Sequence, residues 1–323
     1  MRHTEKQQYE ISEICEIKLG GYLQKILIEG TKKSNPVVIC LHGGPGSPIP
    51  FNVGSRGLFP EIKEYFTLVC WDQLGCGINN RVIDDSFHID DFEKMTLELI
   101  SYIHSRFEHN RIYLFGMSWG SLLTLKAASG SEYVDGAVCN GQVLHNETFN
   151  DEVFTTLEKS RMPECKKKQL ETYKNDINAQ NAKKIMGFVN RYTDGYFCRS
   201  KHDKTEKLPV FKIIKGMLSS PDYRFRDLKA VVINGYAKNN TLIEEFVRQD
   251  VRPLLSNIKI PYTIVQGSTD IVTPTAFVKQ FIKTNKNKNV RLIVIENCGH
   301  FPDARVNRTC IEQLKVLDRQ CRG

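Results

Sequence analysis

The sequence predicts an α/β protein with a mostly parallel, eight-stranded sheet flanked by helices and interrupted by an inserted, mainly helical cap. Three observations predict this class: short apolar runs typical of buried strands, amphipathic helices between them, and a long polar stretch that breaks the alternation. Alternating strands and helices form a parallel sheet that is covered on both faces. The strands are expected at residues 11–17, 22–28, 36–41, 66–71, 111–115, 134–139, 262–266 and 290–295.

The helices follow from periodicity. Between residues 91 and 107, apolar side chains recur in steps of three and four, which indicates an amphipathic helix. Further helices are expected at residues 121–128, 241–251 and 275–282, and over the last residues of the chain. The first two strands flank Gly20-Gly21 and predict a β-hairpin.

A change of composition divides the chain into two domains. From about residue 144 to residue 253 it is polar and rich in lysine and asparagine. We therefore predict a core made of residues 1–143 and 254–323, with residues 144–253 inserted as a helical cap.

Composition excludes several classes of protein. Hydrophobic residues make up 41% and charged residues 25%, as in globular proteins. The net charge of +8 comes from dispersed basic residues, which disfavours nucleic-acid binding. No apolar run approaches the ~20 residues of a membrane span. The polar residues 1–8 carry no secretion signal, so we expect a cytoplasmic protein. The ten cysteines contain no Cys-x-x-Cys pair, so no metal site is expected.

A G-x-S-x-G pattern at residues 116–120 is the strongest single signal. The pattern alone arises by chance in many proteins, but here it joins a predicted strand to a predicted helix. That context predicts a nucleophile elbow, with Ser118 as the nucleophile. The helix behind it turns N–H groups toward the site.

The serine needs a base and an acid, which follow it in the chain order Ser, Asp, His. Asp270 comes just after the strand at 262–266, and His300 just after the strand at 290–295. Both should reach the carboxyl edge of the sheet. There His300 takes the proton of Ser118, and Asp270 orients the imidazole ring. Asp270 could instead only cap a helix. Asp303 is a weaker alternative for the acid.

Acyl transfer also needs N–H donors for the developing oxyanion. One donor is expected at the backbone of Trp119, which follows the nucleophile. The other is expected in the glycine-rich loop at residues 42–46, which follows the strand at 36–41. Taken alone, such a loop would be only a turn.

These motifs resemble those of the proline iminopeptidase-like branch of the α/β-hydrolases. The resemblance rests on His-Gly-Gly-Pro-Gly at 42–46, Trp-Asp-Gln at 71–73, residues 116–121, Gly-Ser-Thr-Asp at 267–270 and Gly-His at 299–300. It covers about residues 35–140 and 258–318. It implies a cytosolic enzyme without a cofactor that removes an N-terminal residue, often proline, from small peptides.

The resemblance also implies particular binding groups. It makes Gly44 and Trp119 the oxyanion donors, and Gly43 and Trp119 are expected to touch the substrate. Leu74 departs from the family, which has arginine there. Iminopeptidases hold the substrate ammonium with cap glutamates, but no matching motif occurs. The candidates, which we expect to be solvated helix residues, are Glu147, Glu152, Glu244 and Glu245.

Several hypotheses remain open. The leading one is an aminopeptidase acting on small peptides. The second is a hydrolase of carboxylic esters or small amides with the same triad. The third is a catalytically inactive binding protein, and a lyase on the same fold stays open as well.

The sequence carries no sign of an oligomeric state. Secondary expectations are a core role for Trp71, a strand cap or site contact for Gln142 and a buried thiol at Cys298.

Overall fold

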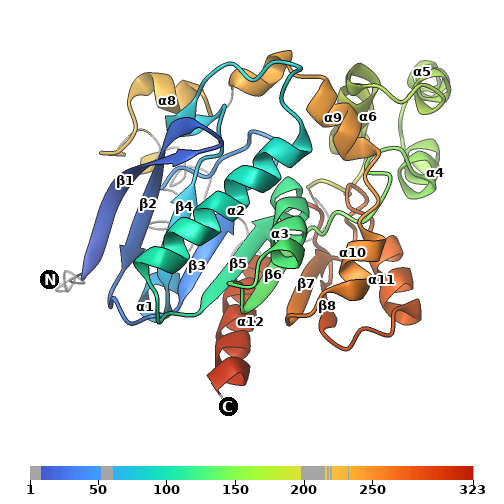
Figure 1. Ribbon diagram of the computed structural model, residues 1–323. Helices are drawn as coiled ribbons and strands as arrows, with labels where there is room; N and C mark the ends of the chain where they lie inside the picture. Colours follow the sequence, from blue (N-terminus) through green and yellow to red (C-terminus); the bar gives the residue numbers. More distant parts are fainter. Residues whose placement is uncertain are drawn as a thin grey trace, which may run out of the picture.

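The computed structural model describes residues 9–51, 61–197, 215–216, 218, 220–231 and 233–322. Its centre is an eight-stranded sheet in the order β1-β2-β4-β3-β5-β6-β7-β8 (Figure 1). The strands are β1 (Ile11–Leu19), β2 (Tyr22–Gly30), β3 (Val37–Leu41), β4 (Thr67–Trp71), β5 (Ile112–Met117), β6 (Gly136–Asn140), β7 (Tyr262–Gly267) and β8 (Val290–Ile295).

The sheet is mostly parallel, as predicted. Strands β4, β3, β5, β6, β7 and β8 pair in parallel, while β2 runs antiparallel to both β1 and β4. Every strand begins and ends within two residues of its predicted bounds. The agreement has a physical reason: central strands such as β6 are buried at every position, so their continuous apolar runs are unambiguous.

Helices cover both faces of the sheet (Figure 1). One face packs against α2 and α3, whose apolar side chains join the larger hydrophobic cluster. The other face packs against α1 and α12. These helices are α1 (Ile62–Tyr65), α2 (Ile89–Arg106), α3 (Trp119–Gly130), α11 (Thr275–Thr284), which packs on β8, and α12 (Ala304–Arg322).

The inserted segment is helical where the structure describes it. Its elements are α4 (Asp151–Lys159), α5 (Glu164–Lys174), α6 (Ala179–Tyr192), α8 (Phe225–Lys229), α9 (Thr241–Val247) and α10 (Arg252–Asn257). Helices α4, α5 and α6 gather at one end of the sheet's upper edge in Figure 1, whereas α8 lies at the other end, beside β1 and β2.

One helix is shorter than expected. The sequence predicts a helix to residue 251, but α9 ends at Val247. The next residues pair with another segment instead: the carbonyl of Gln249 accepts the N–H of Asn146, and the N–H of Val251 donates to the carbonyl of Leu144. This tertiary pairing replaces the last helical turn, which a local pattern cannot reveal.

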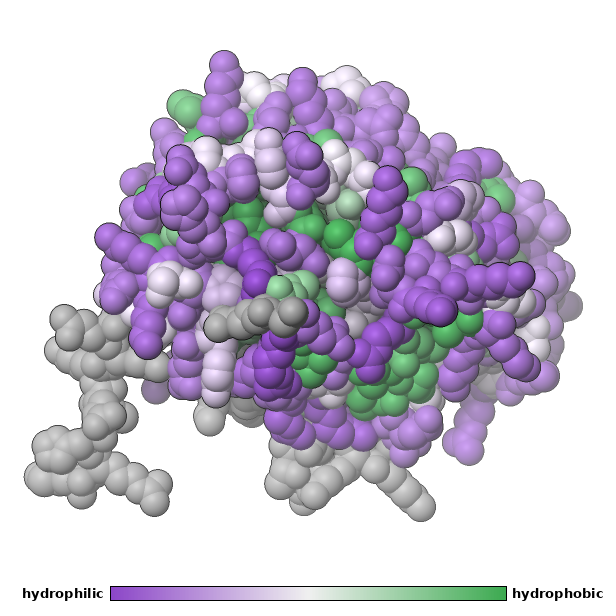
Figure 2. Space-filling view, turned by 60° about the horizontal axis from the view of Figure 1, so that its bottom comes forward, coloured by the Kyte–Doolittle hydropathy of each residue, from purple (hydrophilic) through white to green (hydrophobic). Residues whose placement is uncertain are grey.

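The face of the molecule shown in Figure 2 is predominantly hydrophilic. In Figure 2, hydrophobic residues form separate patches among polar ones. Within the described ranges, no helix combines the length and apolar character that a bilayer span requires. The polar residues 1–8, on which the expectation of a cytoplasmic location rests, lie outside the described residues.

Candidate active site

Ser118 lies in the turn between β5 and α3, at the carboxyl edge of the sheet. Its φ of 50° is in the left-handed region, which side chains other than glycine rarely adopt. The flanking glycines let other backbone pass close by. A Cβ on Gly120 would lie 2.0 Å from the carbonyl oxygen of Leu41, and a Cβ on Gly116 would lie 2.6 Å from the carbonyl oxygen of Gly120. The turn therefore has the geometry of the predicted elbow.

The structure brings the three predicted residues Ser118, His300 and Asp270 together. Nε2 of His300 lies 2.9 Å from Oγ of Ser118, and Nδ1 of His300 lies 2.9 Å from Oδ2 of Asp270. The side chains of His300 and Asp270 are 9% and 1% exposed. A carboxylate only accepts hydrogen bonds, so Nδ1 carries the hydrogen and Nε2 is left to accept the serine proton.

Each oxygen of Asp270 has its own partners. Oδ1 accepts the N–H groups of Val272 at 2.9 Å and Thr273 at 3.0 Å, as a capping residue does. Oδ2 faces His300 and also accepts the hydroxyl of Thr273 at 2.8 Å. Asp270 therefore both caps the following turn and contacts His300. The bonds to Oδ1 hold the carboxylate in place, so that Oδ2 faces the ring.

A backbone segment of the inserted region holds the histidine. The N–H of His300 donates to the carbonyl of Gly195 at 2.9 Å, and the N–H of Phe301 donates to the carbonyl of Tyr196 at 2.9 Å. A Cβ on Gly299 would lie 2.7 Å from the same Tyr196 oxygen. Sequence analysis missed this contact. Its one signal is the glycine before the histidine, which permits such a close approach.

The glycine-rich loop after β3 lies against the elbow. A Cβ on Gly43 would lie 3.1 Å from the carbonyl oxygen of Met117 and 3.4 Å from Cβ of Ser118. Gly44 has a φ of 123°, and its peptide bond to Pro45 is cis. The loop therefore lies against the nucleophile, which is where an oxyanion loop has to be.

Trp119 begins α3, so its N–H is among those that a helix does not pair internally. Its indole is completely buried and packs edge-on against Phe92 and Phe246, with ring centroids 5.9 and 5.5 Å away. The ring is therefore part of the core, and the contact of Trp119 with a substrate stays a prediction.

Gln73 joins the two candidate oxyanion segments. Its Oε1 accepts the indole N–H of Trp119 at 2.8 Å, and its Nε2 donates to the carbonyl of His42 at 3.2 Å. The N–H of Gln73 donates to Nε2 of His42 at 3.0 Å, so Nδ1 of His42 carries the hydrogen and donates to the carbonyl of Gly43. Burial lowers the pKa of His42 to about 4, which keeps the ring neutral. Gln73 belongs to the Trp-Asp-Gln motif at 71–73, but no local pattern predicts its role.

One candidate glutamate is buried. Glu147 is 1% exposed and lies in the loop before α4, not on a solvated helix as expected. Its Oε1 accepts the N–H of Leu144 at 3.3 Å, while Oε2 has no hydrogen-bond partner among the described residues. Burial raises the pKa of Glu147 well above its usual value, and the nearby Asp270 adds to the rise. The buried carboxyl therefore favours its neutral, protonated form.

The other three candidate glutamates are partly buried rather than fully solvated. Glu244 accepts the N–H of Ala179, which begins α6. Glu245 contacts Nδ1 of His88 at 2.5 Å and accepts the N–H that begins α2. Glu152 lines a cavity of about 320 Å³ whose wall includes Asp270 but neither Ser118 nor His300.

The secondary expectations are resolved by contacts. Asp303 binds the side chain of Arg305 and is not the histidine's partner. Gln142 is buried, and its side chain accepts the hydroxyl of Tyr262 and donates to the carbonyl of Val143. Trp71 and Cys298 are buried, as predicted. In the part of the chain that the structure describes, no cluster of three His, Cys, Asp or Glu side chains could hold a metal ion.

Comparison with known families and proteins gives consistent matches. A profile of the alpha/beta hydrolase fold matches residues 36–302. The chain is 27% identical over 307 residues to a probable aminopeptidase, YbaC, of Bacillus subtilis, covering 89% of this chain and 90% of that protein. It is 30% identical over 121 residues to a proline iminopeptidase of Lactobacillus helveticus, covering 35% and 38% of the two chains.

Two solved structures share the fold. The proline iminopeptidase of Mycobacterium smegmatis superposes with a TM-score of 0.62 at 14% identity, covering 96% of this chain and all of that one (100%). VinJ superposes with a TM-score of 0.64 at 18% identity, covering 97% and 99%. At these identities the likeness concerns the fold.

Proposed function

Because the chain belongs to the α/β-hydrolase fold family and is a hydrolase, we propose that it works as a serine hydrolase through an acyl-enzyme on Ser118. The observation that carries this proposal is the continuous pair of hydrogen bonds from Ser118 through His300 to Asp270, each 2.9 Å long. A serine hydroxyl becomes a useful nucleophile only when such a base is in contact with it.

The reaction follows from this geometry. Nε2 of His300 takes the proton as Ser118 attacks the carbonyl carbon, and the carboxylate of Asp270 stabilises the imidazolium that forms. The N–H groups of Gly44 and Trp119 donate to the oxyanion. His300 then protonates the leaving group, and a water molecule activated by the same base hydrolyses the acyl-enzyme.

The proposed substrate is a small peptide with a free amino end. The support is the probable aminopeptidase from Bacillus subtilis, since that match spans 89% of this chain. The proline iminopeptidase relatives support the same class over shorter segments. The enzyme would release the N-terminal residue of such a peptide.

A specific observation favours a second candidate, an ester or small-amide hydrolase. An aminopeptidase needs a carboxylate to bind the substrate ammonium. Among the four glutamates considered, Glu147 is buried where its neutral form is favoured, and Glu244 and Glu245 are hydrogen-bonded to the starts of helices. Glu152 lines a cavity that does not include Ser118. An uncharged substrate would need none of them.

A paired substrate panel distinguishes these candidates. Wild type and Ser118→Ala are assayed with aminoacyl amides, their N-acetylated forms and short-chain esters. An aminopeptidase cleaves the amides that have a free amino group but not their N-acetylated forms, whereas an esterase prefers the esters. Glu147→Gln should leave the KM for aminoacyl amides within about twofold, because burial favours the neutral acid, which binds no ammonium. If wild type is not labelled at Ser118 by a fluorophosphonate, the serine hydrolase proposal is wrong.

A further inference from the structure

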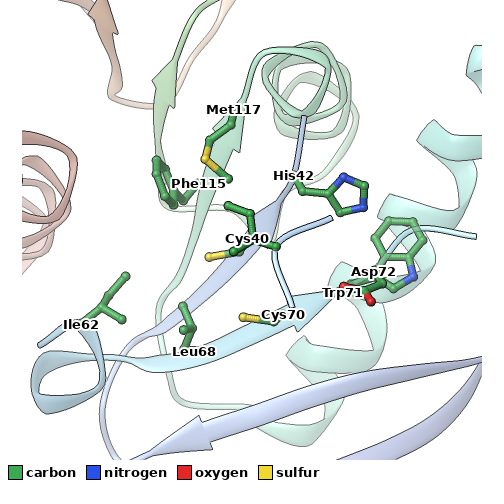
Figure 3. A pocket seen from close by; sticks show the side chains of 10 residues that line it. Cys40, His42, Ile62, Leu68, Cys70, Trp71, Asp72, Phe115 and Met117 are labelled. Carbon is green, nitrogen blue, oxygen red and sulfur yellow. The ribbon is translucent and has the colours of Figure 1, made fainter. Parts of the chain in front are cut away.

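Three sulfur-bearing side chains line a small cavity beneath the active-site turns (Figure 3). They are Cys40 of β3, Cys70 of β4 and Met117 of β5, which come from three neighbouring parallel strands. The cavity holds about 30 Å³, and its remaining exposed surface is almost entirely apolar. It is large enough for a ligand the size of one or two water molecules.

The two thiols lie side by side. Cys40 and Cys70 are direct partners in the register of β3 and β4, so their side chains emerge on the same face of the sheet. Both are half-buried free cysteines. The neighbouring Cys40 raises the pKa of the Cys70 thiol, and burial and the nearby Asp72 add to the rise. Cys70 is therefore a neutral thiol at physiological pH.

The same three strands lead directly into the catalytic turns. Met117 immediately precedes Ser118. Cys40 is two residues before His42, which starts the glycine-rich loop, and Cys70 is three residues before Gln73. A ligand that pulled the three sulfurs together would shift the ends of all three strands, and with them the nucleophile and its oxyanion donors.

We propose that Cys40 and Cys70 form a binding site for trivalent arsenic, taken up as arsenite, and that occupancy of this site inhibits the hydrolase. Two As–O bonds break and two As–S bonds form. Each thiol proton leaves with a hydroxide as water: As(OH)₃ + 2 RSH → (RS)₂AsOH + 2 H₂O. Arsenic stays trivalent, so the step needs no oxidant or reductant. The soft sulfur of Met117 borders the same cavity.

Redox balance and charge favour the arsenic dithiolate over two other outcomes. A direct S–S bond between Cys40 and Cys70 would need a two-electron oxidant, whereas the arsenite step needs none. Two thiolates on a monovalent soft metal ion would leave a net negative charge in an apolar cavity beside Asp72, which is unfavourable. The arsenic dithiolate is neutral.

The test measures arsenic on the full chain. Protein incubated with arsenite is passed through a desalting column, and bound arsenic is counted by mass spectrometry. We expect a single arsenic per wild-type chain and none on Cys40→Ser or Cys70→Ser. Cys321→Ser is the matched control, because that half-buried thiol packs on the same cluster but bonds to the carbonyl of Asp135; it should keep the arsenic.

A second measurement needs no variant. Arsenite-treated wild type is alkylated after unfolding, and the cysteines that arsenic protects are mapped. Protection of Cys40 and Cys70 supports the site. Protection of other cysteines, or of none, overturns it, and so does arsenic that persists on both serine variants.

The inhibition, unlike the binding, rests on the proposed function. Arsenite should slow fluorophosphonate labelling of Ser118 at least tenfold, and a small dithiol should restore it. Unchanged labelling despite protected Cys40 and Cys70 would refute the inhibition alone. A chain that is never labelled, even without arsenite, would refute the serine mechanism and leave the binding result intact.

Discussion

The indole nitrogen of Trp119 donates a hydrogen bond to Oε1 of Gln73 at 2.8 Å, and both side chains are completely buried. The amide of Gln73 also holds the carbonyl of His42. One side chain therefore links the helix that starts behind the nucleophile to the loop that carries Gly44. Because an oxyanion donor acts only when it is correctly placed, this link should matter for the rate.

Replacing Gln73 by methionine should lower kcat about 10- to 100-fold with little change in KM, since misplaced donors weaken the transition state more than the bound substrate. Methionine keeps the volume of the side chain but loses both hydrogen bonds. Steady-state kinetics on the best substrate of the panel measures the two parameters separately.

The chain contains its own control for that variant. Trp71 donates its indole N–H to Oε1 of the buried Gln24 at 2.9 Å, and Gln24 also donates to the carbonyl of Leu19. Gln24→Met should therefore destabilise the fold by a similar amount, about 1–3 kcal/mol, while kcat stays unchanged. Equal kinetic effects of the two variants would show that the link is merely structural.

Asp270→Asn should reduce kcat by about 10⁴, because an amide no longer stabilises the imidazolium form of His300. Asp303→Asn should leave kcat within about twofold, since that carboxylate binds Arg305 instead. Assays of both purified proteins decide between the two acids. A larger loss for Asp303→Asn would reverse the assignment.

Gly44→Ala should abolish most activity. At a φ of 123° an alanine is strained, and its Cβ would lie 2.5 Å from the backbone nitrogen of Gly46. The loop would have to move, taking the Gly44 N–H away from the oxyanion. Gly187→Ala is the control, because nothing lies within 4 Å of a Cβ on this exposed position of α6. It should stabilise the protein by about 0.5–1 kcal/mol and leave kcat unchanged.

The stability of the protein should fall as the pH rises toward neutrality. Burial raises the pKa of Asp72 to about 7, despite hydrogen bonds from the Tyr223 hydroxyl and the Ile78 N–H. A carboxyl that holds its proton more tightly in the folded state stabilises the fold at low pH, and this contribution is lost up to about pH 7.

Asp72→Asn should remove that contribution, which is on the order of a few kcal/mol. Denaturant unfolding at about pH 5 and pH 8 compares the two proteins. Wild type should lose more unfolding free energy between these pH values than the variant does, and identical losses would contradict the assignment.

The sequence alone determined the fold class and the elements that lead to the candidate site. The central strands are buried on both faces, so their apolar runs mark them directly. Gly116 and Gly120 are required because neighbouring parts of the chain leave no room for a Cβ there. The order of Ser118, Asp270 and His300 could be predicted because all three follow parallel strands, whose carboxyl ends share one edge.

Only the tertiary structure decided which side chains meet. It selected Asp270 over Asp303 as the partner of His300, buried Glu147, turned the indole of Trp119 into the core, and brought Gly195 against the base. These outcomes depend on segments far apart in the chain, whereas periodicity and motifs report only near neighbours. Contacts between distant segments are properties of the packed molecule, and so they lie beyond any local pattern.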